Sequence, residues 1–336
     1  MPNKNIRDAI NETLKLEMRR DPRVVVFGED VVGGLGGSSG IEEAAGGTFG
    51  ITTGLAAEFG RRRVLDMPIT ESAIIGMAGG AALTGLRPVA ELMFIDFIGV
   101  CFDQILNQIA KFRYMFGGKA DVPLVIRTMI GAGMGTGPQH SQALYNVLAH
   151  VPGIKVVLPS NAYDAKGLLT TAIRDNDPVI FCEHKAIYTE SCEVPDESYA
   201  IPFGQAAITR TGKDVTVVAL SRMVLLANAV ADRLAKEGIS VEVLDPRTIS
   251  PLDTASILAS VAKTGRLVVV DECNPFCSVA SEITSLVACE ALSSLKSAPV
   301  KVTAPHTPVP ATPHLEQLYV PSPAAIEKAI RATLAG

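Results

Sequence analysis

Residues 63–92, RVLDMPITESAIIGMAGGAALTGLRPVAEL, decide the fold. They contain a strand-like run at Arg63–Leu65, a helical pattern at Ser72–Thr84 and a second strand-like run at Pro88–Leu92. Strand-like and helical runs alternate in the same way before and after this stretch. Because such alternation is typical of a mostly parallel sheet with helices on both faces, the sequence predicts an α/β protein built from doubly wound domains.

The alternation divides the chain into two domains, and 336 residues are enough for two ordinary cores. Periodicity is lost in residues 189–204, TESCEVPDESYAIPFG, which carry two prolines and several acidic residues and are therefore predicted to be a linker. We expect a first domain at 1–188 and a second at 205–336. Within them we expect a helical pattern around 97–114 and, in the proline-rich tail at 304–323, no helix before its end.

The composition excludes several classes of protein. The net charge is -5 and the Lys and Arg residues are spread along the chain, so nucleic acid is not an expected partner. The apolar run at Ile74–Leu86 is too short and glycine-rich to span a bilayer, and the charged, helix-patterned residues 1–20 do not resemble a signal peptide. We therefore expect a cytoplasmic protein that does not interact with a membrane.

The cysteine and glycine patterns argue against zinc, redox and nucleotide sites. The glycines at 31–50 are spread over a long loop, whereas a dinucleotide fingerprint needs GxGxxG at the start of a helix. The six cysteines lie far apart, except for one pair whose spacing is wider than CxxC, so we expect buried free thiols. These cysteines are Cys101, Cys182, Cys192, Cys273, Cys277 and Cys289.

A single carboxylate, Glu71, follows the first strand of the opening stretch and precedes an almost wholly apolar helix. Ligands in open α/β sheets gather at the carboxyl ends of strands, so Glu71 lies where a binding residue is expected. Thr70 or Ser72 could cap the helix. A structural interpretation is also available, because an acidic residue in the first turn is stabilised by the helix dipole.

Three further candidates follow the next two strands. Met93 and Phe97 lie beyond the second strand, in VAELMFIDF, where ordinary core packing is the alternative interpretation. His140 lies in GPQHSQ, a glycine-rich loop after a third strand, and one loop histidine is usually not functional. An acid, an apolar surface and a histidine after successive strands nevertheless predict a cofactor cleft.

Eight motifs are spread along nearly the whole chain: GED, PITESAIIGMAGGAALTGLRPVAELMFIDF, DQILNQIAKFRYMFGG, QHSQ, VVLPSNAYDAKGLL, IRDNDPVIF, PRTISPLD and KTGRLVVVDE. As a set they resemble the beta subunit of the thiamine-diphosphate-dependent dehydrogenase component of 2-oxoacid and acetoin dehydrogenase complexes, with the acetoin branch most similar. The resemblance implies two doubly wound domains, one a pyrimidine-binding (transketolase central-like) domain and the other a transketolase C-terminal-like domain.

The resemblance also implies roles for four residues. In this family the aminopyrimidine of thiamine diphosphate removes a proton from the thiazolium carbon once a carboxyl group hydrogen-bonds a pyrimidine nitrogen, and Glu71 matches that carboxyl group. Met93 and Phe97 match residues that line the aminopyrimidine pocket, and such an apolar surround strengthens the hydrogen bond. His140 matches an active-site histidine associated with transfer to the lipoyl group.

The resemblance further implies a loop that binds a monovalent cation such as K⁺. Its ligands would be the carbonyl groups of Leu124, Ala172 and Ile173 and the side chains of Asp175 and Asp177. Relatives can carry Asn at the last of these positions. The alternative interpretation of RDND is an ordinary polar turn at the end of a helix.

The chain resembles half of an active site. Wider family members hold diphosphate and Mg²⁺ with a GDG segment followed by Asn, and this chain contains no GDG. The resemblance therefore implies an alpha subunit that supplies the diphosphate and Mg²⁺ site, in a heterotetramer of two alpha and two beta chains, and a lipoyl-bearing acyltransferase as a further partner. Phe276 stands where close relatives are expected to have Arg, which could alter contacts with the acyltransferase.

The function implied is cleavage of acetoin to acetaldehyde and a hydroxyethyl intermediate that is passed to lipoate. The loop GAGMGTGPQHSQ has no Lys or Arg beside His140, which favours a neutral substrate over a 2-oxoacid. One alternative is a pyruvate or branched-chain 2-oxoacid dehydrogenase beta subunit, in which decarboxylation replaces acetaldehyde loss. A catalytically inactive scaffold subunit is a second alternative, although the presence of Glu71 and His140 argues against it.

Overall fold

The computed structural model describes residues 1–33 and 46–335, so most of the predicted glycine-rich loop lies outside the described residues. The chain forms two compact units. The first unit contains 1–130, 147–183 and 187–202, and the second contains 131–146, 184–186 and 203–336. The domain boundaries at 188 and 204 stay predictions.

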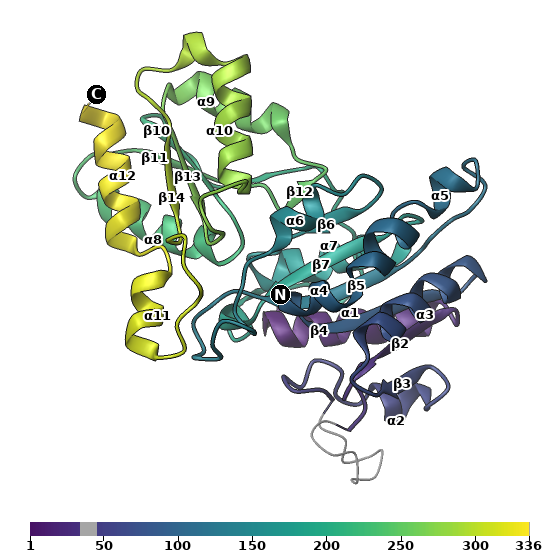
Figure 1. Ribbon diagram of the computed structural model, residues 1–336. Helices are drawn as coiled ribbons and strands as arrows, with labels where there is room; N and C mark the ends of the chain where they lie inside the picture. The colour runs from purple at the N-terminus through teal and green to yellow at the C-terminus, as the bar shows by residue number, and fades with distance from the viewer. Residues whose placement is uncertain (34–45, 336) are drawn as a thin grey trace. The chain divides into compact units, whose positions relative to one another are not determined.

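The first unit is built on a parallel sheet with the strand order β6-β7-β5-β4-β2-β3 (Figure 1). All positions of β4, β5 and β7 are buried, as expected for strands covered on both faces. The strands of this sheet are β2 (Val24–Glu29), β3 (Val64–Met67), β4 (Arg87–Phe94), β5 (Val125–Ile130), β6 (Lys155–Val157) and β7 (Val179–His184).

Helices pack on both sides of this sheet and on one another. Helix α1 packs against α7, and α3 packs against β4 and α4. The apolar spacing of α1 buries Ile10, Leu14 and Met18, so this helix is formed by its amphipathic pattern. The helices of this part of the chain are α1 (Ile6–Arg20), α2 (Leu55–Phe59), α3 (Glu71–Leu83), α4 (Ile98–Asp103), α5 (Phe112–Met115), α6 (Tyr145–Ala149) and α7 (Ala162–Arg174), with 3-10 turns η2 (Ile95–Phe97) and η4 (Lys185–Ile187).

The helical pattern expected at 97–114 is confirmed, but the segment is not one regular α-helix. The segment is divided into α4, a π-helix η3 (Gln104–Ile109) and α5, and Cys101 has non-helical dihedral angles. Ile105 and Ile109 of the π-helix are both buried, and η3 packs against α3. The wider turn keeps these side chains in the core without changing their apolar spacing, so periodicity could not reveal it.

The linker expected at 189–204 contains a short strand, β8 (Ser191–Glu193). It pairs antiparallel with β1 (Asn3–Asn5) at the start of the chain. Neither strand was predicted, because three-residue strands with exposed positions carry no hydrophobic alternation.

The second unit has a sheet with the order β14-β13-β10-β11-β9. Its strands are parallel except β9, which is antiparallel to β11 at the edge. Helices α8 and α12 cover one face through a continuous apolar core, while α9 packs on β10 and α10 on β13. The elements are β9 (Ala207–Arg210), β10 (Val215–Ala219), β11 (Val241–Asp245), β12 (Thr248–Ser250), β13 (Leu267–Asp271), β14 (Val300–Thr303), α8 (Arg222–Ala235), α9 (Thr254–Thr264), α10 (Val279–Glu290), η5 (Leu292–Ser294), α11 (Pro313–Tyr319) and α12 (Pro323–Ala335).

The expectation that the tail at 304–323 is non-helical before its end is also wrong. Helix α11 lies inside it and has Pro313 in its first turn. A proline there costs no helical hydrogen bond, because the first N–H groups of a helix have no partner within the helix. Among residues 1–33 and 46–335, no helix is long and apolar enough to cross a membrane.

The prediction of buried thiols holds for three of the six cysteines. All six are free. Cys101, Cys182 and Cys273 are buried, whereas Cys277 and Cys289 are exposed and Cys192 is half-buried. The expectation is therefore wrong for the last three: Cys277 lies in the turn before α10, and Cys192 and Cys289 occupy positions of β8 and α10 that are not buried.

Candidate active site

Glu71 is the first residue of α3 and follows β3. Its side chain is half-buried and, within the part of the chain that the structure describes, has no hydrogen bond or ion pair. The predicted side-chain cap is wrong. The Thr70 hydroxyl donates to the Pro68 carbonyl (3.0 Å), and the Ser72 hydroxyl donates to the Val100 carbonyl (2.6 Å), which ties α3 to α4.

Met93 lies at the carboxyl end of β4 and Phe97 in the turn η2 that follows, and we call these two apolar side chains the apolar wall. Met93 is 8% exposed, and its Sδ accepts a hydrogen bond from the Thr48 hydroxyl at 3.7 Å. Phe97 is half-buried and lies edge-on to Phe94, with 5.8 Å between ring centroids. The wall is therefore held by neighbours on two sides.

The charge of Glu71 acts on two nearby groups, Cys101 and Glu29. The Cys101 thiol donates to the Phe97 carbonyl (3.6 Å), and burial together with the nearby negative charge of Glu71 raises the pKa of Cys101 to about 12. Burial, followed by the charges of Asp30, Glu71 and Glu91, raises the pKa of Glu29. A carboxylate without a partner, an apolar wall and an excess of negative charge fit an aromatic ring that carries positive charge and hydrogen-bond donors.

His140 belongs to the second unit, whereas Glu71, Met93 and Phe97 belong to the first. Its side chain is half-buried in the segment 131–144. The carbonyl of His140 accepts hydrogen bonds from the Thr136 hydroxyl (3.2 Å) and from the ammonium group of Lys185. The roles of these candidate residues stay predictions.

Lys185 adds a cation that the argument from the loop sequence did not consider. It is 3% exposed, follows β7 and also donates to the Ser141 hydroxyl at 3.3 Å. The loop itself supplies no cation, but another segment brings one to its backbone. Sequence reasoning missed Lys185, His184 and Glu272, although each directly follows or ends a strand and obeys the rule that identified Glu71.

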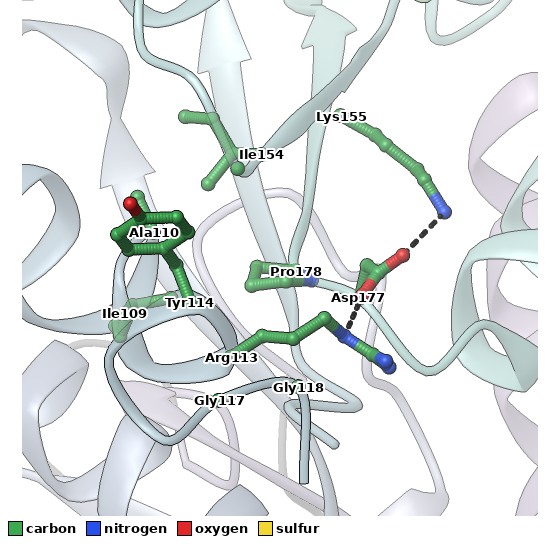
Figure 2. A pocket seen from close by; sticks show the side chains of 11 residues that line it. Ile109, Ala110, Arg113, Tyr114, Gly117, Gly118, Ile154, Lys155, Asp177 and Pro178 are labelled. Atoms are coloured by element: carbon green, nitrogen blue, oxygen red, sulfur yellow. Dashed lines mark hydrogen bonds and ion pairs between the residues drawn. The ribbon is translucent and has the colours of Figure 1, made fainter. Parts of the chain in front are cut away.

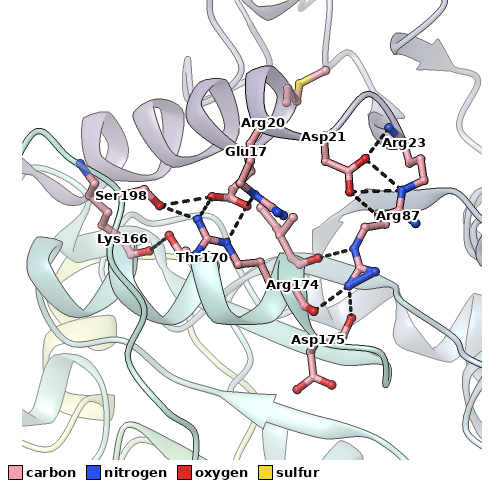
Figure 3. Close-up of polar contacts among 12 residues, drawn as sticks. Glu17, Arg20, Asp21, Arg23, Arg87, Lys166, Thr170, Arg174, Asp175 and Ser198 are labelled. Atoms are coloured by element: carbon pink, nitrogen blue, oxygen red, sulfur yellow. Dashed lines mark hydrogen bonds and ion pairs between the residues drawn. The ribbon is translucent and has the colours of Figure 1, made fainter.

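Four of the predicted cation ligands, Ala172, Ile173, Asp175 and Asp177, lie at the carboxyl end of α7 or in the turn after it, whereas Leu124 directly precedes β5. The carbonyl groups of Leu124 and Ala172 accept hydrogen bonds from backbone N–H groups (2.9 and 3.3 Å). The carbonyl of Ile173 accepts from the guanidinium of Arg87 (2.9 Å), which also binds the next two carbonyls of the turn at 2.7 and 2.8 Å (Figure 3). Several carbonyl dipoles thus point at one cation that the protein itself provides.

The two carboxylates of this turn also have partners. Lys155 Nζ lies 2.7 Å from Asp175 and 3.2 Å from Asp177. Arg113 Nε lies 2.7 Å from Asp177 (Figure 2). A metal ion at this turn would have to share its ligands with three side-chain cations. Among the described residues, no group of three or more His, Cys, Asp or Glu side chains could hold a metal ion.

A hollow of about 650 Å³ adjoins these ion pairs (Figure 2). None of Glu71, Met93 and Phe97 lines it, so it is not the predicted cofactor cleft. Its lining consists of Ile109, Ala110, Arg113, Tyr114, Gly117, Gly118, Gly153, Ile154, Lys155, Asp177 and Pro178.

The fold and its division agree with known proteins. Residues 3–190 match the family described as transketolase, pyrimidine binding domain, and residues 204–326 match transketolase, C-terminal domain. A solved structure titled split gene transketolase, inactive beta4 tetramer, is similar with a TM-score of 0.79 at 24% identity, covering 99% of each chain. These matches define a transketolase-like α/β protein, as the sequence predicted.

Three relatives show which group of transketolase-like proteins this chain is similar to. The beta subunit of acetoin:2,6-dichlorophenolindophenol oxidoreductase from Cupriavidus necator is 57% identical over 99% of this chain and 98% of its own length. The subunit of the same name from Bacillus subtilis is 53% identical over 98% and 96%. The pyruvate dehydrogenase E1 component subunit beta of Staphylococcus epidermidis is 42% identical over 97% of both chains. This chain belongs to the family of beta subunits of the thiamine-diphosphate-dependent 2-oxoacid and acetoin dehydrogenases.

Proposed function

We propose that this chain is the beta subunit of an acetoin dehydrogenase. The enzyme would cleave acetoin, release acetaldehyde and pass the remaining two-carbon unit to a lipoyl group on an acyltransferase. The supporting observation is the 57% and 53% identity to two acetoin:2,6-dichlorophenolindophenol oxidoreductase beta subunits over nearly the whole chain, against 42% to a pyruvate dehydrogenase subunit. A pyruvate or branched-chain 2-oxoacid dehydrogenase is the alternative.

Thiamine diphosphate, when bound, supplies the carbanion chemistry of this reaction. Glu71 would hydrogen-bond a ring nitrogen of its aminopyrimidine and hold the proton at that atom. Met93 and Phe97 would contact the ring and exclude water, so that the single hydrogen bond is strengthened by the low local dielectric. The carboxylate of Glu71 is suited to this role because no described protein group competes for it.

An alpha subunit would supply the rest of the site, including most of the Mg²⁺ ligands, and we propose a heterotetramer of two alpha and two beta chains in the cytoplasm. Helix α3 supports such a partner, because its sequence is apolar on all sides although one face is exposed. Met77 and Leu83 are 39% and 36% exposed, and nothing lies within 4 Å of a Cβ atom placed at Gly80. A helix that is hydrophobic all round is normally buried, so this open face is the proposed contact with the alpha subunit.

Potassium at the α7 turn is proposed only as an addition to the existing contacts. Each carbonyl oxygen has a second lone pair that a cation could use beside the hydrogen bond from Arg87 or a backbone N–H.

Phe276 is 69% exposed and lies edge-on to His306, with 4.8 Å between the ring centroids. The proposed contact with the acyltransferase therefore has an aromatic rather than a cationic surface.

The substrate is tested with the reconstituted alpha–beta complex. Dichlorophenolindophenol reduction would be measured with acetoin, pyruvate and a branched-chain 2-oxoacid under identical conditions. We expect kcat/KM to be highest for acetoin. A tenfold preference for pyruvate, about 1.4 kcal/mol of transition-state discrimination, would favour the alternative.

Replacing Glu71 by Gln tests the role of the carboxylate. The amide has nearly the same volume, so assembly with the alpha subunit should be retained. Turnover should fall by at least 100-fold, because an amide cannot hold the proton as a carboxyl group does. Normal turnover in the assembled Glu71→Gln enzyme would reject the assignment. A reconstituted wild-type enzyme without any turnover would instead favour the scaffold interpretation.

A further inference from the structure

The segment 131–146 leaves the end of β5 but forms part of the second unit, together with residues 184–186. It carries His140, to which the proposed function gives a role in transfer to the lipoyl group. The inference below concerns how this segment is held, and it therefore rests on the proposed function.

The start of the segment lies against the ring of His184. Gly131 has a φ of +85°, and a Cβ atom there would lie 2.1 Å from His184 Nε2. Only glycine can adopt this backbone and approach the ring so closely. The path of the chain after β5 is thus set against a buried histidine that is 3% exposed.

His184 is linked to the segment through Glu272. The Ala186 N–H donates to His184 Nδ1 at 3.3 Å, so Nε2 carries the proton and donates to Glu272 Oε2 at 2.9 Å. The other oxygen, Oε1, accepts the N–H of Ala132 at 2.7 Å. Every polar atom of this buried chain from the Ala186 backbone to the Ala132 backbone therefore has a partner.

Glu272 is held as a carboxylate. Burial alone would raise the pKa of Glu272. The electrostatic interaction and hydrogen bond with His184, together with the hydrogen bond from the Ala132 N–H, outweigh burial, so the pKa of Glu272 is lowered. Glu272 directly follows β13, a fully buried strand. Glu272, which binds both His184 and Ala132, is thus attached directly to the sheet of the second unit.

Two further contacts secure the other end of the segment. The buried Tyr145 hydroxyl donates to Asp271, the residue before Glu272. Lys185, the residue after His184, donates to the His140 carbonyl and to Ser141. Neighbouring residues of two strand ends thus hold the segment on both sides of His140.

We propose that His184 and Glu272 are positioning residues for His140. They fix the backbone of the segment at Ala132, so that the imidazole of His140 is presented to the incoming lipoyl group in one orientation. His184 and Glu272 thereby affect acyl transfer without their own side chains touching the substrate. A displacement of about 1 Å at a reacting group can cost up to about 100-fold in rate, so such positioning is large enough to measure.

Replacing Glu272 by Gln tests the proposal at constant volume. If the amide oxygen accepts the Ala132 N–H, the amide NH₂ faces His184 Nε2, which must then give up its proton. The proton would move to Nδ1, where it meets the N–H of Ala186. One contact of the chain must therefore break, and the segment loses its fixed path.

The reconstituted alpha–beta enzyme would be assayed in two ways with acetoin: reduction of dichlorophenolindophenol, and acylation of a lipoyl domain followed by mass spectrometry. In Glu272→Gln we expect lipoyl acylation to fall at least tenfold more than dye reduction. In a His140→Ala background the same substitution should change this ratio less than twofold, because its effect acts through His140.

Glu242→Gln is the matched control, since Glu242 is fully buried in the same sheet and bonded to Ser260 and Lys263 but not to the segment. Its ratio of the two activities should equal that of the wild type. Equal loss of both activities in Glu272→Gln would overturn the proposal. So would an equal fall in the ratio of lipoyl acylation to dye reduction with and without the His140 side chain. If His140→Ala itself left the ratio unchanged, the proposed role of His140 would fail instead.

A second pair of variants applies if Glu272→Gln does not assemble. Gln at position 184 can still donate to Glu272, whereas Leu cannot. We expect His184→Gln to keep the ratio within threefold of the wild type and His184→Leu to lower it at least tenfold. Equal ratios in these two variants would contradict the proposal.

Discussion

Replacing Arg127 by Met should strongly destabilise the first unit. Arg127 lies in β5 and is 1% exposed. Its guanidinium donates two hydrogen bonds to Glu183 (2.7 and 2.8 Å) and one to Glu91 (2.7 Å). Methionine removes the cation from both buried carboxylates, although the Tyr188 hydroxyl still donates to Glu183 at 2.7 Å.

The cost of this change is limited by protonation of the carboxylates. Protonating a carboxyl group of ordinary pKa at pH 7 costs about 3.7 kcal/mol, because each pH unit is worth about 1.4 kcal/mol. Removing one partner of a buried ion pair typically costs roughly 3–5 kcal/mol. We therefore expect the free energy of unfolding to fall by about 4 kcal/mol at pH 7.

The loss should shrink in acid. Burial already raises the pKa of Glu91 in the presence of Arg127, and without that cation the folded-state pKa rises further. The folded variant then binds protons that the unfolded chain has released, so its stability relative to the wild type increases as the pH falls from 7 towards about 4.3. The gain is up to about 1.4 kcal/mol per pH unit for each carboxyl group that protonates.

Urea unfolding followed by circular dichroism at pH 7, 6 and 5 measures these differences. The control is the triple variant Arg127→Met/Glu91→Gln/Glu183→Gln, which removes the buried charges and should recover much of the loss at pH 7. A loss that is the same at pH 7 and pH 5, or one below about 1 kcal/mol, would refute the assignment of the cost to uncompensated buried carboxylates.

Three further predictions concern acid stability, assembly and thiol reactivity. Burial would raise the pKa of Glu17, but hydrogen bonds from two arginines outweigh it and lower that pKa. The ionised Glu17 should therefore stabilise the folded chain above about pH 4.3 and cease to do so below it. In urea unfolding, the free energy of unfolding of Glu17→Gln should be below that of the wild type at pH 7 and approach it in acid. Gly80→Leu should leave the isolated chain folded but prevent co-purification with the alpha subunit, whereas Ala332→Leu, on an exposed position of α12, should not. Cys277 and Cys289 should react with a thiol reagent in the folded chain before the buried cysteines do, as mass spectrometry of the labelled protein would show.

The sequence by itself determined the α/β class, the two sheets and the family. Long buried strands such as β4 and β10 are near-continuous apolar runs, and α1 and α8 have clear helical spacing, so local pattern and tertiary burial agree there. Glu71 was also predicted as a site residue from the sequence alone, because recognising an isolated acid after a strand and before an apolar helix needs no knowledge of distant residues.

The tertiary structure decided the elements whose local signal is weak. The π-helix η3 keeps the apolar spacing of an ordinary helix, and the three residues of β8 are defined only by their pairing with β1. Helix α11 lies in a proline-rich tail, where composition argues against a helix although a proline in the first turn permits one.

Only the tertiary structure could show how the candidate site is held. Lys185 and Glu272 are far from His140 in the sequence, and their importance comes from hydrogen bonds to the backbone around it. Backbone N–H and carbonyl groups occur at every residue, so the sequence does not mark which of them a distant side chain will bind. Hydrophobic periodicity therefore predicts the sheets and helices, while the contacts proposed to orient His140 come from residues that only folding brings to its segment.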